Sequence, residues 1–145
     1  MSSQKYKGIY LDHAATTQMS DAVEAAMQPY MRENFGNAST VYRYGEEAKD
    51  AIERARGQIA DSLFAKKSEI YFTSGGSESD NWAVKGIAGA QKKKGCHIIT
   101  SRIEHHAILN SCQYLERLGY EVTYLDVDQN GMISTEELER AIRDD

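Results

Sequence analysis

The chain has 145 residues, 41% of them hydrophobic and 27% charged, which is an ordinary globular composition. Its formal net charge is −5, from 17 basic and 22 acidic residues, and this argues against nucleic acid as the main partner, since phosphate binding needs a basic face. No apolar stretch approaches the ~20 residues of a membrane span, and the MSSQKYKG start is followed by no apolar core, so we expect neither an anchor nor a signal peptide. The two cysteines, Cys96 and Cys112, make no disulfide framework, which favours a reducing cytoplasmic compartment.

Apolar residues at helical spacing predict two helices in the first half of the chain. Val23, Met27 and Tyr30 indicate a helix from Ser20 to about Asn34. The same spacing is stronger afterwards and predicts a long amphipathic helix over residues 42–64. The segment FGNAST between them is rich in small and polar residues, which is typical of a turn.

After residue 68 short β-type runs alternate with helical patterns. Strands are predicted at 69–73, 96–100 and 120–127, and helices at 77–93, 106–118 and 135–142. Gly119 is placed to end the second of these helices as a left-handed residue, and Cys112 falls on that helix's apolar stripe. The alternation indicates an α/β fold with a mainly parallel sheet.

Residues 126–137, DVDQNGMISTEE, match the letters of an EF-hand calcium loop. An EF-hand needs a helix running into the loop, whereas Gly119 and the β-formers at 120–125 predict a strand there. Ser134 to Glu137 is a capping-box pattern, and Asn130-Gly131 supplies a turn. We therefore interpret the loop as a structural turn between strand and helix.

The segment YFTSGGSESDNWAVKG (71–86) has the form of a strand, a turn of small residues and a helix. Such a turn directs unpaired backbone amides and the positive end of the helix dipole at one point. Ser77 adds a hydroxyl in the first turn. This is the chemistry of a phosphate cup, although a plain strand-to-helix loop with Ser77 as a cap is the competing interpretation.

The segment SRIEHHAILNSC (101–112) follows the second predicted strand, so its first residues should lie at the same edge of the sheet. Adjacent histidines cannot share one helix face, so at most one of His105 and His106 points into a site. A surface pair is the alternative. A zinc site made by these histidines with Cys96 and Cys112 fits no familiar ligand spacing.

A third segment, YLDHAATTQMS (10–20), looks like an ordered N-terminal arm, and its chemistry cannot be inferred from the residues alone. Five motifs follow one another along the chain: YLDHAATT, FGNAST with RYGEEA, FTSGGSESDN, TSRIEHHAIL and GYEVTYLDVDQNG. In this order they resemble the cysteine desulfurases of iron–sulfur cluster assembly. These are class V, fold-type-I enzymes that use pyridoxal 5′-phosphate. The resemblance covers the whole chain.

The resemblance implies roles for particular residues. Gly76 and Ser77 match the pair that binds the cofactor phosphate, and His105 matches the histidine that stacks on the pyridine ring and performs acid–base work. Asp12 to Thr17, including Ala14, and Asn37 to Ser39 look like segments that border the substrate side. The departures from the family pattern are His13, Gln18, Ala38 and Tyr42, and they concern substrate-side detail.

The resemblance also implies a domain plan: an N-terminal arm over residues 1–15, then residues 16–145 as the N-terminal part of the cofactor-binding large domain, with its sheet incomplete. The strand at 69–73 would lie at one sheet edge and those at 96–100 and 120–125 at the other. The Schiff-base lysine, the aspartate that pairs with the pyridine nitrogen and the persulfide cysteine would all lie beyond the point matching Asp145. Lys85 is in the wrong motif to replace that lysine.

The implied activity is conversion of L-cysteine to L-alanine with sulfur held as an enzyme persulfide, by a cytoplasmic homodimer that supplies an iron–sulfur scaffold or another acceptor protein. We expect the 145-residue chain alone to be inactive, and to be poorly folded, to self-associate or to need a complementary chain. The alternatives are a related class V lyase or aminotransferase, acting on sulfur or selenium, and a non-catalytic binding module that uses the glycine turn or the 126–137 loop.

Overall fold

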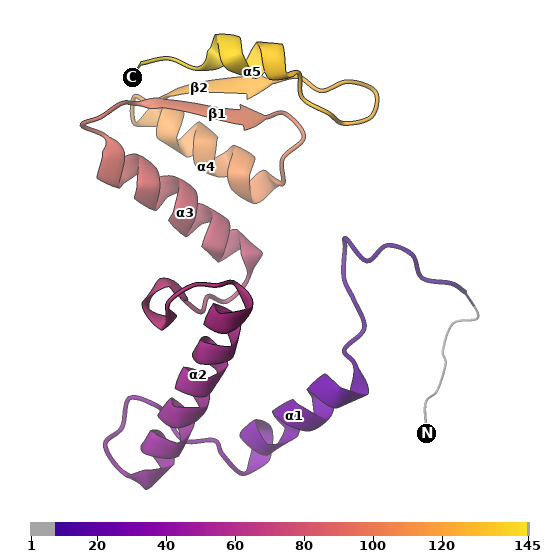
Figure 1. Ribbon diagram of the computed structural model, residues 1–145, viewed down its shortest axis with the longest axis vertical. Helices are drawn as coiled ribbons and strands as arrows, with labels where there is room; N and C mark the ends of the chain where they lie inside the picture. Colours follow the sequence, from indigo (N-terminus) through magenta and orange to yellow (C-terminus); the bar gives the residue numbers. More distant parts are fainter. Residues whose placement is uncertain (1–7, 145) are drawn as a thin grey trace. The chain divides into compact units, whose positions relative to one another are not determined.

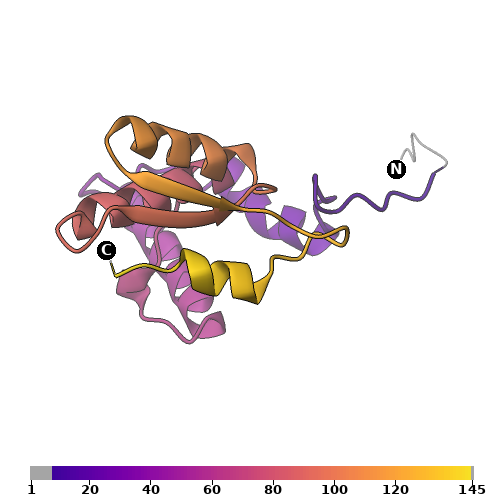
Figure 2. The same ribbon diagram turned by 90° about the horizontal axis from the view of Figure 1, so that it is seen from above.

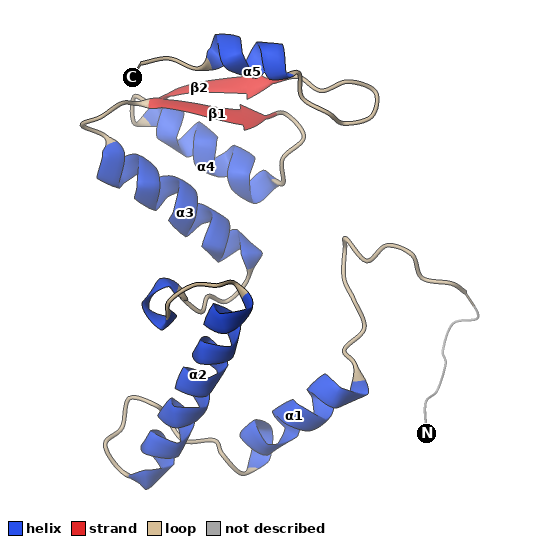
Figure 3. Cartoon of the chain, in the orientation of Figure 1, coloured by secondary structure: helices blue, strands red, loops and turns tan. Residues whose placement is uncertain are grey.

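The computed structural model describes residues 8–144. The chain divides into two compact units, Met1–Tyr71 and Phe72–Asp145, and each is described by itself. The order of elements is α1, α2, the short 3-10 helix η1, α3, β1, α4, β2 and α5 (Figures 1 and 3).

The first unit is built on the two helices that the apolar spacing predicts. α1 spans Asp21–Arg32 and begins at Ser20, whose hydroxyl accepts a hydrogen bond from the Val23 amide at 3.4 Å. α2 spans Arg43–Ser62 and has a buried stripe of small residues, Gly45, Ala48, Gly57 and Ala60. No residue of α1 is buried, so this helix leaves its apolar face exposed.

The turn before α2 is held by side-chain bonds to the backbone. Asn37 Oδ1 accepts from the Ser39 amide at 2.9 Å, and Thr40 Oγ1 donates to the Asn37 carbonyl at 2.8 Å. α2 approaches this turn closely at Gly45. A Cβ atom added there would lie 2.2 Å from Thr40 Oγ1. Only glycine fits at that position, so FGNAST and the glycine behind it form one packed corner.

The predicted strand at 69–73 is wrong. η1 occupies Lys67–Glu69, and residues 70–73 belong to no strand. Ile70 has extended dihedral angles, φ −101° and ψ 124°, yet within residues 8–144 no strand pairs with this segment. A β-type run becomes a strand only when a neighbour supplies hydrogen-bond partners, so local propensity alone gave the wrong state here.

The second unit contains a parallel two-stranded sheet of β1 (His97–Ser101) and β2 (Glu121–Leu125), in which His97 lies opposite Glu121 and Ser101 opposite Leu125. α3 (Gly76–Gln91) and α4 (His106–Arg117) lie on one face of this sheet, and α5 (Thr135–Ala141) lies on the other (Figures 1 and 2). This confirms the α/β class and an incomplete parallel sheet.

The buried core of this unit is centred on α4. Ala107, Ser111, Cys112 and Leu115 face inward, and the Ser111 hydroxyl donates to the Ala107 carbonyl at 2.7 Å. Gly119 follows α4 with φ +88°, which confirms the predicted left-handed end. Leu125 and Tyr120 of the following segment are also buried.

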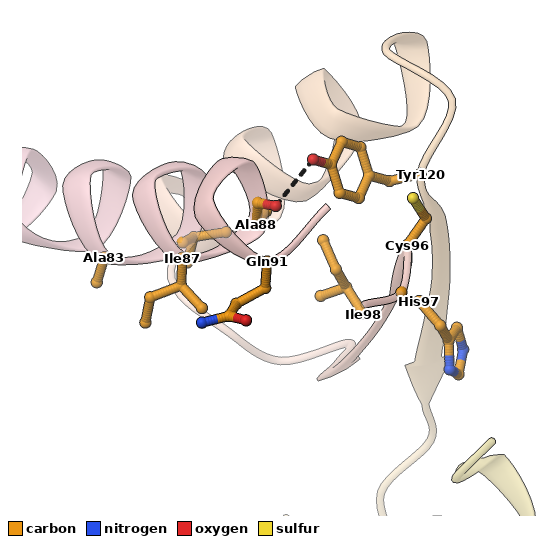
Figure 4. Close-up of a pocket in the computed structure, with 10 residues that line it drawn as sticks. Ala83, Ile87, Ala88, Gln91, Cys96, His97, Ile98 and Tyr120 are labelled. Atoms are coloured by element: carbon orange, nitrogen blue, oxygen red, sulfur yellow. Dashed lines mark hydrogen bonds between the residues drawn. The ribbon is translucent and has the colours of Figure 1, made fainter. Parts of the chain in front are cut away.

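An apolar cavity of about 320 Å³ lies between α3 and β1. Figure 4 shows its lining side chains, and the Tyr120 hydroxyl beside it donates to the Ala88 carbonyl at 2.9 Å. The walls are formed mainly by Ala83, Val84, Ile87, Cys96, Ile98 and Tyr120. Within the described residues, the packing of α3 against the sheet therefore leaves unfilled apolar space.

Candidate functional site

The glycine turn of the second unit leads directly into α3. Gly75 is the residue before the helix and has extended backbone, φ 162° and ψ 178°, and Gly76 and Ser77 are its first two residues. Because these two residues lie in the first turn, no carbonyl inside the helix is placed to accept from their amides, which is the usual state of a helix N-terminus. Within residues 8–144 neither amide donates a hydrogen bond, nor does the Ser77 hydroxyl. Three donors are thus available at one point.

The space in front of these donors is open. A Cβ atom added at Gly75 or Gly76 would find no heavy atom within 4 Å. The backbone is therefore accessible to a ligand that approaches the helix end, and the helix dipole of the 16-residue α3 favours a negative charge there. An anionic oxygen group with several acceptor lone pairs fits this donor set.

Side chains on both sides of the turn hold its shape. Thr73 Oγ1 lies 2.7 Å from Ser79 Oγ and 3.2 Å from the Gly75 carbonyl. The Glu78 carboxylate accepts from the Ser74 amide at 2.6 Å and from the Ser74 hydroxyl at 2.8 Å. These bonds to Ser74 lower the pKa of Glu78 below its ordinary value, so the carboxylate stays ionised at neutral pH.

Sequence reasoning missed these four polar residues. The available signal was a serine one position before the helix cap with a glutamate four residues later, a variant of the reciprocal bonding seen in capping boxes. The sequence pattern predicts Gly76 and Ser77 as donors, but it indicates no side chain that fixes the turn containing them.

His105 lies exposed at the start of α4, where it acts as the N-cap. Its Nδ1 accepts a hydrogen bond from the Ala107 amide at 3.1 Å. A ring nitrogen that accepts carries no proton, so the neutral imidazole has its proton on Nε2. His106 is the first residue of the helix, and the two rings meet edge to face with centroids 6.3 Å apart.

The glycine turn and His105 lie at the same end of the second unit. Figure 1 shows that α3 and α4 both begin at the end of the sheet where β1 and β2 finish, and both helices lie on one face of that sheet. The carboxyl ends of parallel strands are where α/β proteins bind ligands. The structure therefore brings Gly76, Ser77 and His105 to one end of one unit.

Residues 9–145 match the family model described as aminotransferase class-V. The chain belongs to the class-V aminotransferase family.

Relatives in this family are closely similar over the chain. Cysteine desulfurase IscS of Methanosarcina thermophila is 58% identical over 143 residues, covering 99% of this chain and 35% of the relative. A solved NifS-like protein is 40% identical with a TM-score of 0.86, over 92% of this chain and 37% of that one. A structure of SspA in complex with cysteine is 45% identical with a TM-score of 0.83, over 92% and 39%. The chain spans about a third of the length of the curated relatives it matches.

Class-V aminotransferases and cysteine desulfurases use pyridoxal 5′-phosphate, and the donor set of the glycine turn fits the phosphate of that cofactor. The free amides and the Ser77 hydroxyl offer the hydrogen bonds that a phosphate monoester accepts, and the glycines leave it room.

Lys85 is engaged elsewhere, with its Nζ 2.5 Å from Asn81 Oδ1 and 4.6 Å from the Tyr114 ring centroid. Its ammonium helps to pack α3 on α4.

The predicted substrate-side residues belong to the first unit. The Asp12 carbonyl accepts from the Ala15 amide at 3.1 Å and from the Tyr10 hydroxyl at 2.8 Å, so residues 10–15 form a local turn around Ala14. Asn37 is fixed by the turn that precedes α2. The role of these residues at the substrate stays a prediction, as does the boundary between an arm and a large domain at residues 15 and 16.

The 126–137 loop connects a strand to a helix, as predicted. β2 leads into it, and Asp128 Oδ1 accepts from the Asn130 and Met132 amides at 2.8 and 2.9 Å, which lowers the Asp128 pKa. Ser134 caps α5 by accepting from the Glu137 amide. This bond is the half of the predicted capping box that the structure shows, and the Ser134 hydroxyl also donates to the Glu136 carboxylate at 2.7 Å.

The two cysteines differ in environment. Cys112 is buried in the core of α4, as predicted, and burial together with Glu116 raises its pKa, so the unreactive thiol form dominates. Cys96 is half-buried just before β1 and borders the apolar cavity. Across residues 8–144 no group of three or more histidine, cysteine or acidic side chains is arranged to hold a metal ion.

Proposed function

We propose that this chain is the N-terminal part of the cofactor-binding domain of a pyridoxal-phosphate-dependent L-cysteine desulfurase. The observation that carries the proposal is the 58% identity with a cysteine desulfurase over 99% of the chain, which includes the glycine turn and His105. The open, unpaired amides of Gly76 and Ser77 support the cofactor part of the proposal independently of that similarity.

In the proposed role the chain's own residues bind and orient. The Gly76 and Ser77 amides and the Ser77 hydroxyl hold the phosphate, and the dipole of α3 favours its charge. His105 holds or moves a proton at Nε2, because its Nδ1 is occupied by the Ala107 amide. When bound, the cofactor supplies an electron sink for bond cleavage next to the substrate's amino group.

The proposed substrate is L-cysteine, supported by the cysteine complex of a 45% identical protein. The bond between Cβ and sulfur breaks, the carbon skeleton leaves as L-alanine, and the sulfur passes to a cysteine thiol as a persulfide. By the resemblance, that thiol and the Schiff-base lysine lie beyond the position of Asp145. Asp12, Ala14 and Asn37 are proposed to border the substrate.

The proposed setting is a cytoplasmic homodimer that delivers sulfur to an iron–sulfur scaffold or another acceptor protein. The family resemblance suggests this setting, and the names of the curated relatives support its cysteine desulfurase activity. In the part of the chain that the structure describes, no helix has the length and apolar character needed to cross a membrane.

A chimera tests the proposed function. The corresponding first third of the Methanosarcina thermophila relative is replaced by this chain, and release of alanine from L-cysteine is measured with added pyridoxal phosphate. We expect activity to be retained, and we expect a His105→Ala version to lose roughly 100-fold or more in turnover, the usual worth of a general acid–base group. A folded, cofactor-loaded chimera that releases no alanine would contradict the proposal.

The chain by itself provides the complementary test. Purified and supplied with pyridoxal phosphate and L-cysteine, it should release no alanine above a protein-free control. Turnover by the 145-residue chain would show that the residues needed for the reaction are already present in it.

A further inference from the structure

Glu78 places a negative charge in the first turn of α3, beside the amides proposed to hold a phosphate. An ionised carboxylate repels an anionic ligand nearby, so a site built only for affinity would avoid it. The carboxylate is nevertheless bound twice, by the Ser74 amide at 2.6 Å and the Ser74 hydroxyl at 2.8 Å. Its function should therefore lie in those two bonds.

The two bonds fix the backbone just before the glycines. The Ser74 amide points at Glu78, which joins the residue before Gly75 to the third residue of α3. The Thr73 and Ser79 hydroxyls, 2.7 Å apart, make a second link across the same turn. Gly75 and Gly76 lie between the anchored ends and have no side chains of their own to restrict them.

The consequence is an ordered set of free donors. Without the link, Gly75 and Gly76 would sample many backbone conformations, and a ligand would bear the entropy cost of ordering them. With it, the Gly76 and Ser77 amides keep a common direction before any ligand arrives. The two donors of Ser74 also offset the charge of the Glu78 carboxylate at the edge of the site.

We propose that Glu78 is a positioning residue, which holds Ser74 so that the Gly76 and Ser77 amides are preorganised for a phosphate monoester. The inference rests on the proposed function, because it takes the cofactor phosphate as the ligand. Glu78 does not contact the phosphate and acts only through the backbone of the turn.

The test compares two ligands that differ only in the phosphate, pyridoxamine 5′-phosphate and pyridoxamine. Neither forms an imine with surface lysines, because each carries an amine in place of the aldehyde. Binding to the 145-residue chain is measured by equilibrium dialysis, and far-UV circular dichroism of each variant reports its fold. The ratio of the two affinities isolates the phosphate contribution, and a general loss of stability would not move that ratio selectively.

Four variants separate positioning from charge. Glu78→Ala removes both bonds, and we expect the phosphate preference to fall roughly tenfold or more, the worth of a charged hydrogen bond. Ser74→Ala removes one bond and should give a smaller loss. Glu78→Gln keeps an acceptor of the same length and should restore part of the preference. Asp80→Asn removes a charge from the same helix, where no side-chain bond of Asp80 is present, and should leave the preference unchanged or slightly raised.

The outcomes separate the positioning role of Glu78 from the proposed cofactor site. If the wild-type chain shows the phosphate preference and Glu78→Ala keeps it, the positioning role is overturned while the proposed cofactor site stands. The role is equally overturned if Glu78→Gln loses as much of the preference as Glu78→Ala, or if Asp80→Asn does. If circular dichroism shows the wild-type chain to be folded and it has no preference, the cofactor site of the proposed function fails and the inference falls with it. If the wild-type chain is not folded, the same measurements on the cofactor-free chimera decide. If Glu78→Ala does not fold, Ser74→Ala and Glu78→Gln decide.

Discussion

The two units of the chain differ in how far they bury their apolar side chains. The second unit buries Cys112 and Leu115 beneath a parallel sheet, and its strands and helices support one another. In the first unit α1 buries nothing, and Val41 and Phe64 are 92% and 100% exposed. The residues proposed to hold a cofactor phosphate are all in the unit with the core. This comparison indicates that the second unit provides a rigid support for the site and that the first unit needs further contacts to cover its apolar side chains.

The largest expected effect concerns association. Because the exposed apolar side chains of the first unit have no cover within the described residues, we expect the isolated chain to self-associate through that unit, while the second unit stays folded around its own core. Sedimentation velocity over a concentration series should show a mass that rises with concentration. A monomer at low concentration with a cooperative far-UV melt would contradict this expectation.

Phe64 sharpens that prediction at one position. It is fully exposed and has φ +53°, a left-handed conformation that asparagine tolerates better than phenylalanine. Phe64→Asn should lower the association and should not reduce stability.

The next effect concerns the core of the second unit. Leu115 is 3% exposed, so Leu115→Ala should lower the free energy of unfolding by about 2–5 kcal/mol through lost burial and a new cavity. Leu118→Ala provides the control, since that side chain follows the same helix but is 51% exposed. Urea unfolding measures both. Equal effects at the two positions would show that α4 is not packed as described.

A pair of glycines tests the packed corner of the first unit. Gly45→Ala should destabilise by roughly 1–3 kcal/mol, because the new Cβ would lie 2.2 Å from Thr40 Oγ1. Gly89→Ala should stabilise by about 0.5–1 kcal/mol, because that helical position is open and alanine is the better helix former. A Gly45→Ala midpoint that is equal to or above that of the unchanged chain would contradict the close approach at Gly45.

The smallest expected effect is the pH dependence that Asp128 contributes. Its folded pKa lies below the ordinary 3.8, because the Met132 and Asn130 amides bond the carboxylate. The contribution to stability is therefore complete above that ordinary value and is lost as the pH falls through the lower folded pKa. Asp128→Ala should flatten the acid limb of the stability curve, whereas Asp50→Asn on the exposed surface of α2 should not. An acid limb that Asp128→Ala leaves unchanged would exclude this role.

Local patterns in the sequence predicted most of the elements, and the failures share a cause. Apolar periodicity gave α2 and α4 to within about two residues, the usual uncertainty of helix ends, and Gly119 marked an end correctly. The run at 69–73 has the residues of a strand, but strand formation depends on a partner that local sequence does not reveal. The capping pattern placed Ser134 correctly at the start of α5, whereas its second bond, to Glu136, depends on a rotamer that the pattern does not specify.

The candidate site, like the fold, was predictable only where local sequence decides the structure. A glycine turn before a helix was enough to suggest a phosphate cup, with a plain capped loop as the alternative, because the chemistry involved is that of the backbone. The assignment of the phosphate to Gly76 and Ser77 came from the family resemblance and stays a prediction. The Ser74–Glu78 bonds were not predicted, because side-chain geometry decides them. The roles of Asp12 and Asn37 depend on contacts beyond their own turns, and neither spacing nor composition encodes such contacts.

The most direct test of the central claim maps the phosphate contact on the isotope-labelled, cofactor-free chimera, because the isolated chain is expected to self-associate. In ¹⁵N–¹H correlation spectra, titration with pyridoxamine 5′-phosphate should shift the Gly76 and Ser77 amide signals to saturation, and pyridoxamine should leave them in place. Saturating shifts confined to other amides, or none with either compound, would contradict the claim that the start of α3 holds the phosphate.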